Sequence, residues 1–166
     1  MKAVGDKLRE WAINENDDHI VNMFGRSAVN RYYYATFISV VCELVIIDDD
    51  WKYINHKDIP AKLSNKLNRY IKNNIKRQYK SNSIDYEDKM KYINIINESI
   101  SSLSSLMKEA YSLRVKADYD FDEKAIKNDG KIIFCKKSLS HMQSWHSRAN
   151  KDLGRILKVC KKLGIL

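Results

Sequence analysis

The sequence predicts an all-α fold, an antiparallel helical bundle of about five helices that forms a single domain over residues 1–166. One proline and five glycines are very few, while Lys, Asn, Ile and Leu are plentiful, and this composition favours long helices with short connections over a sheet-rich fold. Apolar residues recur at helical spacing, and no segment alternates convincingly with the period of a strand. A chain of this length also builds a core without disulfides or a metal.

The first two expected helices occupy the N-terminal third of the chain. The first places on one face Val4, Leu8, Trp11 and Ala12. The second has Asp17 or Asp18 as its N-cap and runs through a nearly apolar stretch, 32–47, to three acids at 48–50. This stretch is shorter than the ~20 residues of a membrane span and contains Glu43, so a buried bundle helix and no membrane partner are expected. Because acids at a helix C-terminus oppose the macrodipole, packing or a basic neighbour has to hold that end.

A third helix is expected to start at Asp58, with Pro60 in its first turn. Its apolar positions follow 3–4 spacing and are Leu63, Leu67, Tyr70, Ile71 and Ile75. The opposite face is basic and carries Lys62, Lys66, Arg69, Lys72, Lys76 and Arg77. The segment 79–85 has the composition of a loop.

The fourth and fifth helices follow this loop. A stripe close to a heptad repeat predicts the fourth, with Met90, Ile93, Ile96, Ile100, Leu103, Met107, Ala110 and Leu113. Gly130 is expected to break or start the last helix. The apolar residues assigned to that helix are Phe134, Met142, Trp145, Ala149, Leu153, Ile156 and Cys160.

The net charge of +9 is distributed in blocks. Residues 51–80 carry +8 and residues 121–166 carry +7, whereas residues 1–50 carry −4 and residues 81–120 carry −2. Such asymmetry favours RNA, DNA or an acidic protein as a partner, and the alternative is a lysine-rich solvated face. The three cysteines (Cys42, Cys135 and Cys160) are far apart and odd in number, so buried free thiols in a reducing compartment are expected. The N-terminus has no apolar signal segment, so the expected location is cytoplasmic.

The sequence lacks the motifs that are typical of zinc sites, phosphate-binding loops and serine hydrolases. The four histidines, His19, His56, His141 and His146, show no zinc-ligand spacing, and there is no glycine-rich phosphate loop or nucleophile elbow. Carboxylates at 48–50 could bind Mg²⁺, although a run of acids at a helix end is more often solvated. No metal and no cofactor are expected.

Two segments carry a family resemblance. NRYYYATF (30–37) is similar to the Ser-Arg-x-Tyr-Tyr-Ala-x-Phe helix of the HEPN family, small helical-bundle proteins common in prokaryotic toxin–antitoxin and antiphage systems. Asn30 stands in place of the serine, and Ile38 stands where many members have a histidine. YSLRVKADYD (111–120) resembles the family's Leu-Arg-x-x-Ala-Asp-Tyr segment. The similarity covers residues 17 to about 160 and implies a HEPN-like bundle. From the residues themselves, we expect Arg31 to stack or to pair with an acid, and Asp118 to pair with Arg31 or Arg114.

The resemblance places a degenerate catalytic motif at Arg114. Ribonucleases of this family use an Arg-x(4–6)-His motif, a dimer and no metal, with the histidine moving protons and the arginine stabilising the phosphate. Here Tyr119 stands five positions after Arg114, and tyrosine is a poor base at neutral pH. No arginine of the chain is followed by a histidine at the required distance, although His141 or His146 could approach Arg114 in three dimensions. The family's modifiable toxin tyrosine is replaced by Phe121.

These observations lead to one main hypothesis and two alternatives. The main hypothesis is a HEPN-like component of a bacterial defence or toxin–antitoxin system that binds RNA or a partner protein through the basic helix 58–80 and the basic C-terminal helix. The expected binding residues are Arg31, Lys62, Lys66, Arg69, Lys72, Lys76 and Arg77. The resemblance implies a nucleotidyltransferase, nuclease or ATPase as partner, in a homodimer or hetero-complex that buries the aromatic helix 31–47. The alternatives are a metal-independent endoribonuclease toxin centred on Arg114 and a purely structural subunit.

Overall fold

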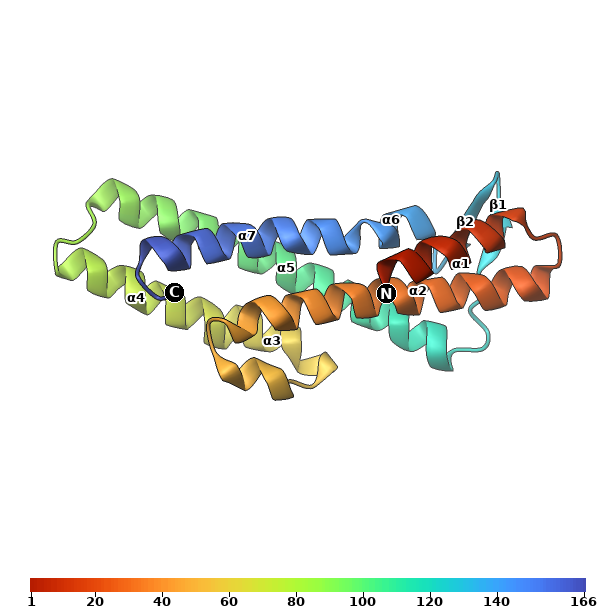
Figure 1. The fold of residues 1–166 in the computed structure, drawn as a ribbon, viewed down its shortest axis with the longest axis horizontal. Helices are drawn as coiled ribbons and strands as arrows, with labels where there is room; N and C mark the ends of the chain where they lie inside the picture. Colours follow the sequence, from red (N-terminus) through yellow and green to blue (C-terminus); the bar gives the residue numbers. More distant parts are fainter. The chain divides into compact units, whose positions relative to one another are not determined.

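The computed structural model describes residues 1–166 and confirms an all-α helical bundle (Figure 1). Its long helices are α1 (Lys2–Asn14), α2 (Asp18–Val45), α4 (Asn68–Lys80), α5 (Tyr86–Tyr119) and α7 (Trp145–Lys162). None of the helices combines the length and the apolar content that a membrane span needs.

The chain divides into two compact units. The first unit contains residues 1–39 and 109–147, and the second contains residues 40–108 and 148–166. The helices α2, α5 and α7 each run through both units. The division into units therefore leaves the single domain expected from the sequence as a prediction.

In the first unit, α1 packs on α2 through a face that matches the predicted one only in part, since Ala12 is buried as predicted. Gly5 and Ala12 are buried, whereas Val4 and Trp11 are about half exposed. A Cβ atom on Gly5 would lie 2.8 Å from Cε1 of Tyr32, so the missing side chain lets the two helices approach closely. The start of α2 follows the prediction, because Oδ1 of Asp17 accepts a hydrogen bond from the backbone N–H of His19 at 2.8 Å.

The C-terminal end of α5 is held by Arg26 of α2. Its Nε and Nη1 donate to the backbone carbonyls of Ala117 and Glu123, each at 2.9 Å, and Nη2 reaches the carbonyl of Lys116 at 3.5 Å. The guanidinium also lies 5.6 Å from the centroid of the Phe121 ring. A cation is therefore placed where the last helical carbonyls lack intrahelical partners.

A small antiparallel sheet, not predicted from the sequence, follows α5. It has the strand order β1 (Ile126–Asn128), β2 (Lys131–Phe134) and β3 (Lys137–Ser138). The prediction of a helix starting near Gly130 is wrong, because Asp129 and Gly130, with φ of 47° and 70°, form the two-residue turn between β1 and β2. Phe134 is buried from β2, and the helical structure resumes with the short helix α6 (Leu139–Gln143) and with α7.

The second unit begins where α2 ends. The chain passes through 3₁₀ turns η1 (Asp49–Tyr53) and η2 (His56–Asp58) into α3 (Ile59–Lys62), and a π-helical turn, η3 (Leu63–Leu67), joins α3 to α4. Pro60 lies in the first turn, as predicted. In Figure 1, α4 and the first part of α5 form a hairpin, with α7 beside α5.

The core of the second unit follows the predicted stripes with two exceptions. Leu63, Leu67, Ile71 and Ile75 are fully or almost fully buried, as are most apolar positions of α5 and α7. Tyr70 and Met90 were predicted to be buried and are instead 46% and 38% exposed.

The expectation of buried cysteines holds for one thiol only. Cys160 is buried, Cys135 is half-buried and Cys42 is exposed, and all three are free.

Candidate nucleic-acid interface

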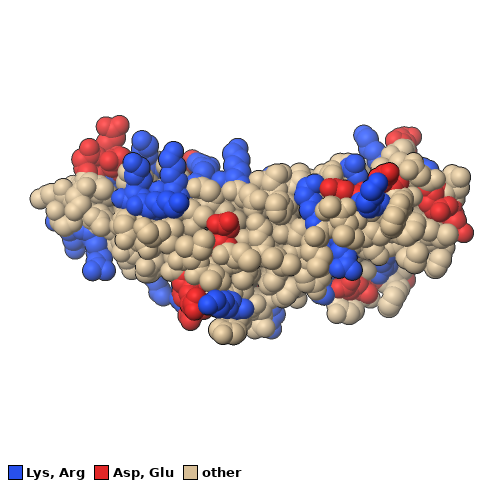
Figure 2. Space-filling model, viewed as in Figure 1, with Lys and Arg blue, Asp and Glu red and all other residues tan.

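The net positive charge of the protein lies almost entirely in the second unit. This unit carries 18 basic and 10 acidic residues, a net charge of +8, whereas the first unit carries 12 and 11, a net charge of +1. Figure 2 shows Lys and Arg side chains gathered over α4 and α7, in the left part of the view. No Asp or Glu occurs between Asp58 and Asp85, so the whole of α4 is free of acids.

Three neighbouring hollows lie along the exposed side of α4, and we call them together the α4 groove. They have volumes of about 420, 420 and 600 Å³. Asn73 lines all three, and Arg69 and Lys76 each line two, so the hollows are neighbours along α4. Its cations are Lys66, Arg69, Lys72, Lys76, Arg77, Lys80 and Lys89. The buried positions Leu67, Ile71 and Ile75 leave the rest of the helix surface to these polar side chains.

Two of the predicted binding lysines already have partners in the protein. Lys66 Nζ lies 2.9 Å from Oδ2 of Asp48 and 2.7 Å from Oδ2 of Asp50, and the hydrogen bonds that it donates to Asp50 and Asp48 raise the pKa of Lys66 above its ordinary value. Lys62 Nζ lies 4.6 Å from the centroid of the Trp51 ring and donates to the carbonyl oxygen of Asp50 at 2.9 Å. The helix α2 ends at Val45, before the acids at 48–50, and Asp48 and Asp50 have the basic neighbour that was predicted for this segment.

The other predicted cations of α4 are available to a ligand. Arg69, Lys72, Lys76 and Arg77 form no ion pair, and all except the half-buried Lys72 are exposed. Arg69, Lys72 and Lys76 lie at the spacing of one helical face, and Arg77 follows Lys76 about 100° further around the helix. All four line the α4 groove, so the structure brings together four of the six predicted cations of this helix in an unneutralised form.

Exposed tyrosines accompany the cations of the groove. Tyr70 lines its first hollow, and Tyr79 lines its last. Lys89 of α5 lies 4.2 Å from the ring centroid of Tyr79 and 5.6 Å from that of Tyr86. Sequence reasoning missed the tyrosines, Lys80 and Lys89, because it assigned Tyr70 to the core and placed 79–85 in a loop. Cations interleaved with aromatic faces suit a single-stranded nucleic acid, whose phosphates and bases need these two kinds of contact.

The first unit brings the two HEPN-like motifs together. Arg114 Nη2 lies 2.9 Å from Oδ2 of Asp118 and donates to the hydroxyl of Tyr34 at 3.1 Å. Asn30 Nδ2 donates to the other oxygen of Asp118 at 2.6 Å. Burial alone would lower the pKa of Arg114, but Asp118 and Tyr34 outweigh it and raise this pKa. The cluster ties α2 to α5, and its arginine is already neutralised.

No hydrogen bond joins Arg114 to Tyr119 or to His141, two of the residues considered as its catalytic partners. Tyr119 is 68% exposed, with its ring centroid 5.8 Å from the guanidinium. His141 lies elsewhere, with Nε2 at 2.7 Å from Oε1 of Glu109. Because Glu109 precedes Arg114 by five residues, the two side chains leave α5 about 140° apart around the helix axis. His141 therefore contacts a different face of α5 from the one that carries Arg114.

Glu109 is the centre of a second polar cluster of the first unit. Its Oε2 pairs with Lys137 Nζ at 2.8 Å, and its Oε1 accepts from the indole of Trp145 at 3.1 Å. Partial burial favours a raised pKa for Glu109, but the hydrogen bonds from Lys137, His141 and Trp145 outweigh it and lower the pKa to about 2. The cluster joins α5 to β3, α6 and α7 within this unit.

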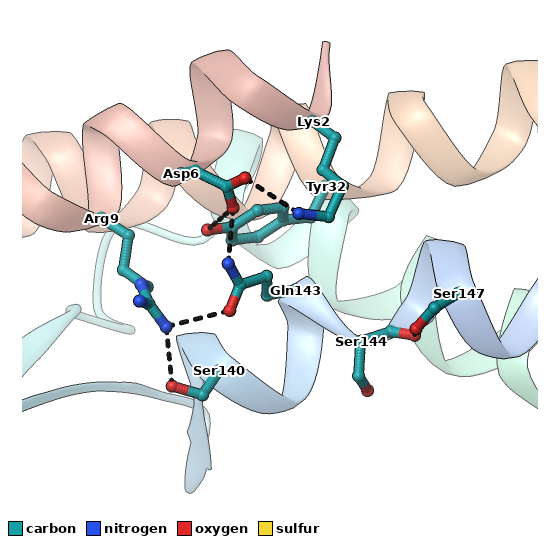
Figure 3. Close-up of polar contacts among 8 residues, drawn as sticks. All are labelled: Lys2, Asp6, Arg9, Tyr32, Ser140, Gln143, Ser144 and Ser147. Carbon is teal, nitrogen blue, oxygen red and sulfur yellow. Dashed lines mark hydrogen bonds and ion pairs between the residues drawn. The ribbon is translucent and has the colours of Figure 1, made fainter.

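A third cluster connects α1 with α2 and α6 (Figure 3). Asp6 accepts hydrogen bonds from Tyr32 at 3.1 Å, from Gln143 at 2.7 Å and from Lys2 at 2.9 Å. Arg9 donates to Gln143 at 3.0 Å and continues the network. The hydrogen bonds of Asp6 and Arg9 therefore fix α1 to α2 and α6.

Arg31 does not make the contact expected of it. It is exposed, and its Nη1 approaches Sδ of Met1 at 3.8 Å, with neither an aromatic ring nor an acid as partner. The reason is its position on the outer side of α2, since Tyr32 and Tyr33 take the buried positions that follow it.

Comparison of the chain with known protein families, curated protein sequences and solved structures gives no match. The HEPN resemblance therefore rests on the residues of the two motifs.

Proposed function

We propose that the protein binds single-stranded RNA in the α4 groove. The observation that carries the proposal is the group of cations without ion pairs, set beside exposed tyrosines in three neighbouring hollows of α4; these cations are Arg69, Lys72, Lys76 and Arg77. RNA phosphates supply the negative charge that neutralises these cations, and the tyrosine rings offer faces on which bases stack. The HEPN resemblance supports a setting in bacterial defence or toxin–antitoxin biology, with a protein of the same system as partner.

RNA cleavage by the same protein is the second candidate, and the structure offers it less support. The arginine of the motif is paired with Asp118, and His141 is held by Glu109. Incubation of the purified protein with RNA in EDTA tests this candidate directly. Intact RNA is expected, and cleavage that disappears in Arg114→Ala would establish the ribonuclease instead.

Fluorescence anisotropy with a labelled 20-nucleotide RNA tests the binding proposal. The groove variant changes Arg69, Lys72 and Lys76 to Ala, and the control variant changes three unpaired exposed lysines outside the groove, Lys108, Lys124 and Lys131, to Ala. Both variants lose the same net charge. For three phosphate contacts with a single strand, the slope of log K against log salt should fall by about 2, which is roughly a 100-fold loss of affinity at 0.1 M salt.

The control variant should stay close to the wild type. Equal affinity of the groove variant and the control would show that the groove is not the site. Absence of RNA binding by the wild type at low salt would leave an acidic protein as the partner of this surface, contrary to the proposal.

A further inference from the structure

A hollow between α5 and α7 lies within the second unit and is separate from the α4 groove, because no residue lines both. It has a volume of about 500 Å³, and we call it the α5–α7 hollow. Each of the two helices lines it with four residues at the spacing i, i+3, i+4 and i+7, which is one face of a helix. These residues are Asp88, Lys91, Tyr92 and Ile95 of α5, and Arg155, Lys158, Val159 and Lys162 of α7. The hollow therefore runs along two neighbouring helices for about two turns, ~10 Å at 1.5 Å per residue.

Aliphatic side chains from both helices contribute to the α5–α7 hollow. Val159 of α7 is buried, and Ile95 of α5 is half-buried. The α4 groove differs, because its tyrosines Tyr70 and Tyr79 are exposed. Aliphatic side chains offer no ring on which a base stacks, whereas they pack well against Leu, Ile or Met of another protein. The surface of the α5–α7 hollow is therefore better suited to a protein than to a nucleic acid.

Unpaired positive charge lies on both helices that form the hollow. Lys91 of α5 and Lys158 and Lys162 of α7 are exposed and form no ion pair. Arg155 is neutralised by Glu98, with 2.7 Å between Nη2 and Oε2. Cations on both sides of an apolar strip favour a partner whose acidic residues flank an apolar face.

We propose that the α5–α7 hollow binds an acidic amphipathic helix of a partner protein. Such a helix presents apolar residues at i, i+3, i+4 and i+7, and an apolar helix face laid between two helices is a common mode of recognition. Its acidic residues on either side of that face would meet Lys91 on α5 and Lys158 and Lys162 on α7. The partner is thus defined by its chemistry, and its binding does not require RNA in the α4 groove.

Fluorescence anisotropy with a labelled peptide of about 16 residues, long enough to form a helix, tests the proposal. The acidic peptide carries Leu at i, i+3, i+4 and i+7, Glu on both sides of this face and Ala elsewhere. One control peptide has Ala in place of Leu, and a second has Lys in place of Glu. The acidic peptide should bind saturably, and each control peptide should bind at least about tenfold more weakly, because each lacks one of the two kinds of contact.

Two variants of α7 locate the binding surface. The hollow variant carries Lys158→Glu and Lys162→Glu, and its control carries Arg148→Glu and Lys151→Glu, two exposed and unpaired cations of the same helix that do not line the hollow. The hollow variant should bind the acidic peptide at least about tenfold more weakly than the wild type, because two attractions become repulsions. The control variant has the same net charge and should stay within about twofold of the wild type, since salt screens charges outside the site. Circular dichroism of each variant verifies that the helices are retained.

Several outcomes would overturn the inference without touching the proposed function. They are no saturable binding of the acidic peptide by the wild type, equal binding of the three peptides, and equal binding of the acidic peptide by the hollow variant and its control. A hollow variant that keeps the peptide but binds the 20-nucleotide RNA more weakly than its control would make the hollow part of the RNA interface, and would overturn the inference as well. The groove variant should bind the acidic peptide like the wild type, so failure of RNA binding in the α4 groove would leave this result intact.

Discussion

Replacing Glu109 by Gln should remove a pH-dependent part of the stability of the first unit. The folded protein lowers the pKa of Glu109 from 4.5 to about 2, because three hydrogen-bond donors converge on the carboxylate. A carboxylate with a depressed pKa stabilises the fold above pH 4.5, and this contribution is lost as the pH falls through the folded value of about 2. At 1.36 kcal/mol per unit the shift is equivalent to about 3 kcal/mol, and solvent screening of this partly exposed group reduces it to ~1–2 kcal/mol.

Urea unfolding followed by circular dichroism at pH 5.5, 4 and 3 measures this contribution. Glu109→Gln should be less stable than the wild type by ~1–2 kcal/mol at pH 5.5, and the difference should shrink steadily toward pH 3. Glu98→Gln is the matched control, because Glu98 is 66% exposed and its pair with Arg155 contributes little. A difference between Glu109→Gln and the wild type that stays constant over this pH range would refute the assignment of the stability to the ionised carboxylate.

Three further substitutions test the packing of the first unit, each by urea or thermal unfolding. Arg26→Ala should cost ~3 kcal/mol, because hydrogen bonds from a charged donor to the end of α5 are lost, and full stability in this variant would show that the carbonyls need no cap. Gly25→Ala should cost ~1–3 kcal/mol, since its Cβ would lie 2.5 Å from Cβ of Ala125, and Ala125→Gly in the same chain should restore part of it. Lys136→Gly should add ~1 kcal/mol, because Lys136 has a φ of 62°, and a loss of stability there would contradict the turn geometry.

The helices could be predicted from the sequence because each carries its own periodic signal. The buried positions Leu63, Leu67, Ile71 and Ile75 follow that period, and so do the cations on the opposite face. The tyrosines of the groove could not be assigned in the same way. Tyr70 is next to Ile71 in the sequence, and periodicity alone does not decide which of two adjacent apolar residues the core accepts.

The three-stranded sheet was missed although one signal for it was present. Its strands are two to four residues long, too short for alternation to be recognised. The pair Asp129-Gly130 is a frequent two-residue hairpin turn, and the apolar residues Ile132 and Phe134 after it alternate toward the core. The second turn, through Cys135 and Lys136, adopts positive φ without glycine or asparagine. Residue preferences therefore could not predict this turn.

Contacts between segments far apart in the sequence could not be predicted from local sequence patterns. Arg26 holds carbonyls about ninety residues further along the chain, and the pairing of Asn30 with Asp118 spans a similar distance. The cluster at Arg114 was partly predictable, because the sequence offered Arg31 or Arg114 as partners of Asp118, and the structure selects Arg114.

The pairing of Lys66 with Asp48 and Asp50 makes the two ends of the α4 groove unequal as anion-binding sites. These carboxylates belong to the same chain, so they act at Lys66 as a tethered competitor whose effective concentration, on the order of millimolar or more, does not fall on dilution. An anion that arrives at this end has to displace them, whereas an anion that arrives at Lys76 or Arg77 meets no such competitor. Under the proposed function, an RNA strand would therefore be anchored first at the far end of α4, and Lys66 would join last, only for ligands that bind strongly enough elsewhere.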